Sequence, residues 1–205
     1  MDRKAHWDKA YSGWEADCWS WFQDSPTVSL ALIRACGLAS GARIIDVGGG
    51  GSTLTGELLG QGFTGMSVLD ISSAALEKSR ERLGDDVALG VNWIESDITG
   101  FSTDDRFDLW HDRAVFHFLT DAGDRERYRE VLFRHLKPGG FLIVSTFAVD
   151  GPKKCSGLDI VGHDAESLHK ELGGDRLQML ESCEEEHVTP KGGVQKFIYG
   201  RFQRV

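Results

Sequence analysis

The chain has 205 residues, of which 40% are hydrophobic and 27% charged, and its formal net charge is −9. These values fit a single soluble domain, and the N-terminus lacks a signal-like apolar region, so we expect a cytoplasmic protein without a membrane span. The acidic balance and the lack of a basic run argue against nucleic acid as a partner, because phosphate binding draws on clustered Lys and Arg.

Tryptophan is concentrated near the N-terminus. Four of the six tryptophans, Trp7, Trp14, Trp19 and Trp21, fall within the first two dozen residues. This clustering predicts that residues 1–40 form a helical segment that covers a functional site rather than a frayed tail. We find no linker or internal repeat, so residues 1–205 are expected to form one domain.

From residue 43 onward, apolar segments of strand length alternate with helical patterns. Strands are expected near 43–47, 66–70, 91–95, 107–112 and 140–147. The clearest helical stripe, Tyr128, Val131, Leu132, His135 and Leu136, ends at Lys137-Pro138-Gly139-Gly140. This alternation predicts an α/β fold, in which helices cover both faces of a mostly parallel sheet.

The last third of the chain follows a different pattern. Asp164 can cap a short helix through Leu172, and Gly173-Gly174 ends it. Two long strand-like runs, near 176–188 and 194–204, then flank a Pro-Lys-Gly-Gly turn. This turn chemistry predicts an antiparallel hairpin. We therefore expect a Rossmann-like sheet of seven strands with a C-terminal antiparallel hairpin, which is not the usual dehydrogenase arrangement.

A glycine-rich turn follows the first expected strand. Asp46 ends an apolar run, and Gly48, Gly49, Gly50 and Gly51 precede Ser52, which can cap a helix. Glycine allows a sharp turn through positive φ and a close approach of ligand to the backbone. With an acid about 20 residues downstream, such a turn indicates binding of an adenosine-containing cofactor.

Two acids and a threonine indicate which cofactor is bound. Asp70 ends the second expected strand, and Asp97 follows the third. Thr53 stands where a dinucleotide site needs a small residue for close helix–strand packing. An NAD-dependent dehydrogenase therefore remains only a distant alternative.

Together the loop, the spaced acids, the strand order and the terminal hairpin resemble the class I S-adenosylmethionine-dependent methyltransferases, over nearly the whole chain. The resemblance implies that Asp46 orients the glycine loop at the methionine end, that Asp70 holds the ribose hydroxyls, and that Asp97 meets the adenine amine. It implies S-adenosylmethionine as the cofactor and no metal. The implied cofactor residues are Trp21, Asp46, Gly48, Gly50, Asp70, Ile71, Asp97, Ile98 and His111. Ser52 replaces the glycine that commonly ends this loop in the family.

The methyl acceptor is expected beyond the fourth strand, where the family binds it. His111, Asp112, Arg113 and His117 form a dense polar cluster there and are the candidate catalytic residues. His111 is a modest base of the strength that a thiol with a pKa of about 8.5 needs. The alternative is structural: an Asp112–Arg113 pair and a solvated His117.

Several features of the acceptor side leave its chemistry open. The Gly-, Pro- and Ser-containing segment 146–158 is expected to be a loop at the same edge of the sheet, with Cys155 either touching the acceptor or simply buried. The stretch from Asp108 to Leu119 and this loop resemble bacterial thiol and thiopurine S-methyltransferases, whereas the first 23 residues and the glycine loop also resemble elongation-factor lysine methyltransferases. We expect a small thiol or sulfide as the substrate. A protein lysine acceptor and a non-catalytic cofactor-binding module are the alternatives.

Other properties are only weakly determined. The four cysteines, Cys18, Cys36, Cys155 and Cys183, are widely separated and form no Cys/His ligand cluster. We therefore interpret them as reduced thiols rather than as disulfides or zinc ligands. We expect a monomer, although no residue pattern determines the oligomeric state.

Overall fold

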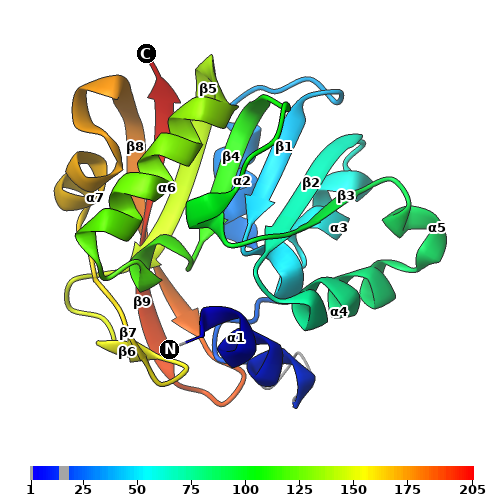
Figure 1. Ribbon diagram of the computed structural model, residues 1–205. Coiled ribbons are helices and arrows are strands. Elements are labelled where there is room, and N and C mark those ends of the chain that lie inside the picture. The colour runs from blue at the N-terminus through cyan, green and yellow to red at the C-terminus, as the bar shows by residue number, and fades with distance from the viewer. Residues whose placement is uncertain (1, 14–18) are drawn as a thin grey trace.

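The computed structural model describes residues 2–13 and 19–205, so Trp14 and Cys18 lie outside the described residues. Over the described ranges the strands form a seven-stranded sheet in the order β3-β2-β1-β4-β5-β9-β8 (Figure 1). The strands of this sheet are β1 (Arg43–Val47), β2 (Gly65–Asp70), β3 (Asn92–Glu95), β4 (Phe107–Arg113), β5 (Leu136–Phe147), β8 (Leu177–Val188) and β9 (Val194–Arg204). Strands β1 to β5 are parallel, β9 is antiparallel to β5, and β8 is antiparallel to β9. The predicted sheet and its C-terminal hairpin are confirmed.

Helices cover both faces of this sheet. They are α1 (Arg3–Ser12), α2 (Thr27–Arg34), α3 (Leu54–Gly60), α4 (Ser73–Leu83), α5 (Asp85–Ala88), α6 (Ala122–His135) and α7 (Ala165–Leu172). Figure 1 shows α6 and α7 in front of the sheet and α2 and α3 behind it. The predicted helix that Asp164 caps is α7, where the Asp164 carboxylate accepts from the Ser167 backbone N–H.

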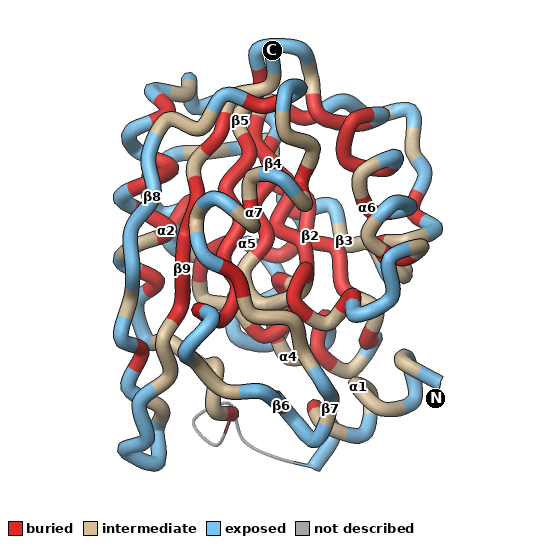
Figure 2. Tube along the Cα trace, turned by 90° about the vertical axis from the view of Figure 1, so that its left-hand side faces the viewer, coloured by how far each residue is buried: buried red, intermediate tan, exposed pale blue. Residues whose placement is uncertain are grey.

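Alternating side chains along the central strands build two cores. In β1, Ile44 packs with α2 and α3, whereas its neighbour Ile45 packs with α6. In β4, Leu109 belongs to the same core as Ile44, and Trp110 belongs to the same core as Ile45. Successive side chains of a strand point to opposite faces, so a strand buried on both sides is apolar throughout. Figure 2 shows the result as a nearly continuous buried track along the central strands.

One strand boundary differs from the prediction. Strand β5 begins at Leu136, directly after α6, and not near residue 140. Leu136 pairs with Phe107, but the next pair is Phe141 with Leu109, so the register shifts across the Lys-Pro-Gly-Gly segment. This segment is therefore an irregularity within a longer strand, with Gly139 at a φ of +74°.

Helix α1 lies across the carboxyl ends of β1 to β4, at the bottom of the view in Figure 1. Its Asp8 carboxylate accepts a hydrogen bond of 2.8 Å from the Ser72 hydroxyl at the start of α4, and Lys4 pairs with Glu95 at 3.1 Å. A two-stranded flap, β6 (Lys154–Cys155) with β7 (Leu158–Asp159), lies at the same edge. No described helix is long and apolar enough to cross a membrane.

Candidate active site

The glycine turn after β1 brings the backbone against the carboxyl edge of the sheet. Gly48 has a φ of +70°, and its N–H donates to the Leu69 carbonyl over 2.7 Å. A Cβ at this position would lie 2.1 Å from a methyl group of Val115, so only glycine fits. The Ser52 hydroxyl accepts from the Leu54 N–H at 3.0 Å and so starts α3.

Asp70 occupies the floor of a cavity at this edge. One carboxylate oxygen accepts from the Gly50 N–H at 3.1 Å, and the other accepts from the Ser72 N–H at 2.9 Å. Burial raises the pKa of Asp70 to about 6, against these two N–H donors, which act in the opposite direction. Gly50 itself does not line the cavity; it holds Asp70 in place.

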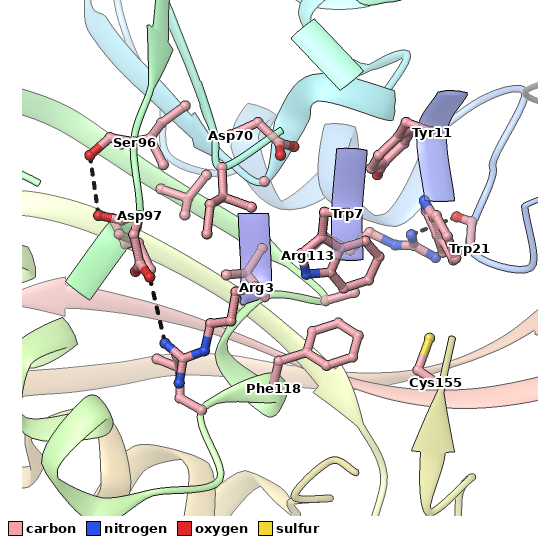
Figure 3. Close-up of a pocket in the computed structure, with 18 of the residues that line it drawn as sticks. Arg3, Trp7, Tyr11, Trp21, Asp70, Ser96, Asp97, Arg113, Phe118 and Cys155 are labelled. Carbon is pink, nitrogen blue, oxygen red and sulfur yellow. Dashed lines mark hydrogen bonds and ion pairs between the residues drawn. The ribbon is translucent and has the colours of Figure 1, made fainter. Parts of the chain in front are cut away.

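The remaining predicted adenosine residues lie close to Asp70. Ile71, Asp97 and Ile98 line the same cavity, beyond the ends of β2 and β3. Asp97 accepts from the Thr99 N–H at 2.8 Å and also lies 3.6 Å from the Arg3 guanidinium (Figure 3). Sequence reasoning missed Arg3, because only docking of α1 brings it to the cavity.

Asp46 and His111 line a second, smaller cavity on the other side of Gly48. Gly48, Tyr11, Trp21 and Arg113 line both cavities, so the two adjoin. The His111 Nδ1 atom lies 2.7 Å from the Asp46 Oδ1 atom, and its Nε2 atom lies 2.9 Å from the Ser29 hydroxyl. His111 is therefore engaged on both ring nitrogens, and it does not line the main cavity.

The main cavity has an aromatic end opposite Asp97. Its wall consists of side chains that are far apart in the sequence: Trp7, Trp21, Phe118, Phe147, Cys155 and Phe197. Figure 3 shows Trp7, Trp21, Phe118 and Cys155 grouped on this side, away from Asp97 and Ser96. The N-terminal tryptophans were a usable sequence signal for this wall, whereas the phenylalanines carried none that separated them from core residues.

Arg113 is the polar group at the aromatic end. Its Nε donates to the Tyr199 hydroxyl at 2.9 Å, and its Nη1 donates to the Trp21 carbonyl at 2.9 Å. The Nη2 atom is buried without a hydrogen-bond partner and lies 3.8 Å from the Glu185 carboxylate. The guanidinium also lies over the Phe197 ring, 4.7 Å from its centroid. Arg113 is thus held rigidly at the junction of the two cavities.

Asp112 and His117 lie outside both cavities. Asp112 is completely buried and accepts from the Tyr128 hydroxyl at 2.7 Å and from the Val115 N–H at 3.1 Å. Burial raises its pKa to about 6. These contacts shape the turn after β4, where Ala114 has a φ of +67° and its neighbour Arg113 enters the cavity wall.

His117 is likewise completely buried, not solvated as the structural alternative assumed. Its Nδ1 atom accepts from the Phe147 N–H at 3.2 Å, and its ring stacks on that of Phe147. Burial, together with the nearby His163 and Arg113, lowers the pKa of His117 to about 3. The neutral ring supports Phe147 from behind the cavity wall.

The chain is similar in sequence to known methyltransferases. A family model described as a methyltransferase domain matches residues 45–142. The ubiquinone/menaquinone biosynthesis C-methyltransferase UbiE of Vibrio parahaemolyticus is 32% identical over 120 residues, which are 57% of this chain and 45% of that protein. EEF1A lysine methyltransferase 2 of Danio rerio is 27% identical over 161 residues, covering 71% and 69% of the two chains.

A solved structure extends the likeness to the fold. The N-methyltransferase NodS of Bradyrhizobium japonicum, in complex with S-adenosylhomocysteine, superposes with a TM-score of 0.65 at 21% identity, over 89% of each chain. The chain spans about half the length of the UbiE proteins that it matches.

The matched segment and the solved structure together show that this chain has the fold of a methyltransferase domain. Its matched core, residues 45–142, runs from β1 into β5. The residues outside that core supply α1, the flap and the hairpin, which contribute Trp7, Cys155 and Phe197 to the aromatic end of the cavity.

Proposed function

We propose that this protein methylates a small sulfur nucleophile, a thiol or a sulfide, with S-adenosylmethionine as the methyl donor. The observation on which this rests is the character of the acceptor end: a partly buried guanidinium, Arg113, whose Nη2 atom has no hydrogen-bond partner, among aromatic side chains. The acids that line the main cavity, Asp70 and Asp97, are both at the adenosine end.

The residues present fit the cofactor. Asp70 offers buried carboxylate oxygens for the ribose hydroxyls, and Ile71 and Ile98 offer apolar surface for the adenine. Asp97 would accept from the adenine amine, in place of its present contact with Arg3. When bound, the cofactor supplies a methyl group activated by a sulfonium cation.

The methionine end would lie along Gly48 and the second cavity. Asp46 Oδ2 is buried without a hydrogen-bond partner, which suits an ammonium group. Trp21 would cover this part of the cofactor, because it lines both cavities. Gly50 would contribute by holding Asp70 through its N–H.

Arg113 supports a sulfur acceptor by its charge. A cation lowers the pKa of an adjacent thiol, whose ordinary value is about 8.5, so the substrate can react as a thiolate. The thiol proton then leaves to solvent before the transfer, and no side chain of the cavity is needed as a base. We therefore assign acceptor contact to Arg113, and positioning roles to His111, Asp112 and His117.

The surrounding aromatic wall supports the same chemistry. A thiolate and a sulfonium neutralise each other in the transition state, so a cavity that excludes water favours an in-line transfer. Cys155 would form part of this wall as an uncharged thiol, because burial raises its pKa. The likeness of the Asp108–Leu119 stretch to thiol and thiopurine S-methyltransferases points in the same direction.

Protein lysine methylation is the second candidate, since the relative from Danio rerio is a lysine methyltransferase by name. An ammonium substrate would have to approach Arg113 and then lose its proton. The like charge of Arg113 disfavours this reaction, and Glu185, which lies 3.8 Å from Arg113, does not line the cavity.

The proposal also covers the class of substrate, the localisation and the domain organisation. The net charge of −9 and the absence of a basic run support a small-molecule substrate rather than nucleic acid, in the cytoplasm. We infer one domain over residues 1–205, a monomer, in which α1 covers the site through Arg3, Trp7 and Tyr11.

The test compares acceptors that differ in the nucleophilic atom. The purified protein is incubated with S-adenosylmethionine and thiophenol, phenol, aniline, sulfide or a lysine-containing peptide, and S-adenosylhomocysteine is measured by mass spectrometry. Turnover is expected with thiophenol or sulfide and not with aniline or the peptide. Turnover on the amines alone would establish an N-methyltransferase. Binding of S-adenosylhomocysteine without turnover on any acceptor would favour the non-catalytic module.

A further inference from the structure

A buried chain of polar side chains connects helix α2 to the glycine loop. The Ser29 hydroxyl lies 2.9 Å from His111 Nε2, and His111 Nδ1 lies 2.7 Å from Asp46 Oδ1. The exposed fractions of these residues are 0% for Ser29 and 2% for both His111 and Asp46. Ser29 precedes the segment that matches the methyltransferase family model, so nothing in that match assigns it a role.

Each hydrogen bond in this chain has a defined direction. A carboxylate oxygen only accepts, so Nδ1 of His111 must carry the proton that points at Asp46. In the neutral form of the ring, Nε2 is then an acceptor to which the Ser29 hydroxyl can donate. Asp46 selects the tautomer in which Nδ1–H faces it, and Ser29 supplies the hydrogen bond at the other ring nitrogen.

The arrangement leaves one oxygen of Asp46 free. Oδ1 is held by His111, whereas Oδ2 is buried without a partner, in a residue that lines the second cavity. A Cβ at residue 49 would lie 2.4 Å from Oδ2, so the glycine there makes room for this orientation of the carboxylate. Leaving a buried charged oxygen unpaired is costly unless a ligand supplies the donor.

We propose that Ser29 and His111 are positioning residues that aim Asp46 Oδ2 at the amino group of the cofactor's methionine moiety. This inference rests on the proposed function, because it takes S-adenosylmethionine as the ligand of the loop. It predicts that the Ser29–His111 pair matters only for ligands that carry the amino-acid part.

Comparing the binding of two ligands distinguishes this positioning role from a general contribution to folding. S-adenosylhomocysteine carries the amino-acid part, whereas 5′-methylthioadenosine shares its adenosine and thioether but lacks the ammonium group. In calorimetric titrations, Ser29→Ala is expected to weaken S-adenosylhomocysteine binding about fivefold, the loss typical of one hydrogen bond. Binding of 5′-methylthioadenosine should stay within twofold of the wild type.

Further variants test whether the effect passes through Asp46. His111→Asn can still donate to Asp46 and should retain more affinity for S-adenosylhomocysteine than His111→Leu, which should lose roughly 20-fold. In an Asp46→Asn background, Ser29→Ala should have no further effect. Thr55→Val is the matched control, since the Thr55 hydroxyl is also buried but has no partner.

The tautomer can be read in the ligand-free protein. Nitrogen-15 NMR of the imidazole should show His111 protonated on Nδ1 and not on Nε2, and Ser29→Ala should shift the Nε2 resonance, because that nitrogen loses its hydrogen-bond donor. Equal weakening of both ligands, no weakening of either, or an Nε2–H tautomer in the wild type would overturn the relay and leave the proposed function standing. If the wild-type protein binds neither ligand, the proposed function and the relay are both overturned.

Discussion

The two ends of the cavity are built in different ways. At the proposed adenosine end, Asp70 ends β2, Ile71, Asp97 and Ile98 lie just beyond β2 and β3, and backbone N–H groups donate to the two carboxylates. At the acceptor end, the wall combines α1, the turn after β4, the flap and β9. The first end depends on local segments at one edge of the sheet, and the second on packing between distant segments.

This difference has a functional consequence. A parallel sheet places the ends of its strands at the same edge, so a cofactor site can be formed by a few short motifs there. The acceptor end can change with each inserted helix or loop without disturbing that edge. The similar proteins include a C-methyltransferase, an N-methyltransferase and a lysine methyltransferase by name, so proteins similar to this chain differ in their acceptors.

The largest expected effect is on cofactor affinity, when Asp70 at the proposed adenosine end is replaced. Asp70→Ala should weaken binding of S-adenosylhomocysteine by about 1.5–3 kcal/mol, or roughly 10- to 100-fold, because hydrogen bonds to a charged group are lost. Calorimetry measures the affinity, with Asp86→Ala, an exposed acid in α5, as the control. An unchanged affinity would remove Asp70 from the ribose site.

Arg113 tests the acceptor end. Arg113→Gln should lower kcat/KM for thiophenol roughly 30-fold, because the cation beside the thiolate is lost. Arg113→Lys should fall in between, since it keeps the charge but not the planar fork. Arg43→Gln, which removes an exposed arginine at the other edge of the sheet, serves as the control. A matching loss of S-adenosylhomocysteine affinity would instead move Arg113 to the cofactor side.

The pH dependence of cofactor binding is a further test of Asp70 at the proposed adenosine end. The pKa of Asp70 is raised to about 6, so the carboxylate is protonated as the pH falls through that value. Affinity for S-adenosylhomocysteine should fall roughly tenfold between pH 7 and pH 5, and Asp70→Asn should flatten the profile. In the ligand-free protein the sign is opposite, because this raised pKa contributes stability at low pH that is lost as the pH rises through about 6. A flat wild-type profile would contradict the assignment.

The smallest expected effect concerns Cys155. Because burial raises the pKa of this thiol, it is neutral near pH 7 and cannot act as an anionic nucleophile. Cys155→Ala should therefore change KM for thiophenol by no more than about threefold, through the shape of the wall, and leave kcat unchanged. Steady-state kinetics decide this, and a large loss of kcat would give Cys155 a chemical role.

Sequence reasoning was most successful where structure is local. The positions of β1 to β4 and of the hairpin follow from hydrophobic pattern and turn residues, and the glycine loop with Asp46, Asp70 and Asp97 follows from spacing along the chain. Strand β5 was the exception, since Lys137-Pro138-Gly139-Gly140 reads as a turn but lies within a strand, between Leu136 and Phe141, which both pair with β4.

The same reasoning was weaker for the polar cluster after β4. His111, Asp112, Arg113 and His117 are close in sequence, yet only Arg113 lines the main cavity. Side chains alternate between the faces of a strand, and the turn at Ala114 redirects those that follow, so sequence proximity does not place them together.

The sequence by itself determined the sheet, the glycine turn and the position of Asp70 and Asp97 at the strand ends, because each depends on residues near one another along the chain. Only the tertiary structure decided which polar groups are hydrogen-bonded to other side chains, as His111 is to Ser29 and Asp46. It also decided that an arginine stands among aromatic side chains at the acceptor end. Burial and the pairing of distant groups set these properties, and both arise from packing between segments that no local pattern relates.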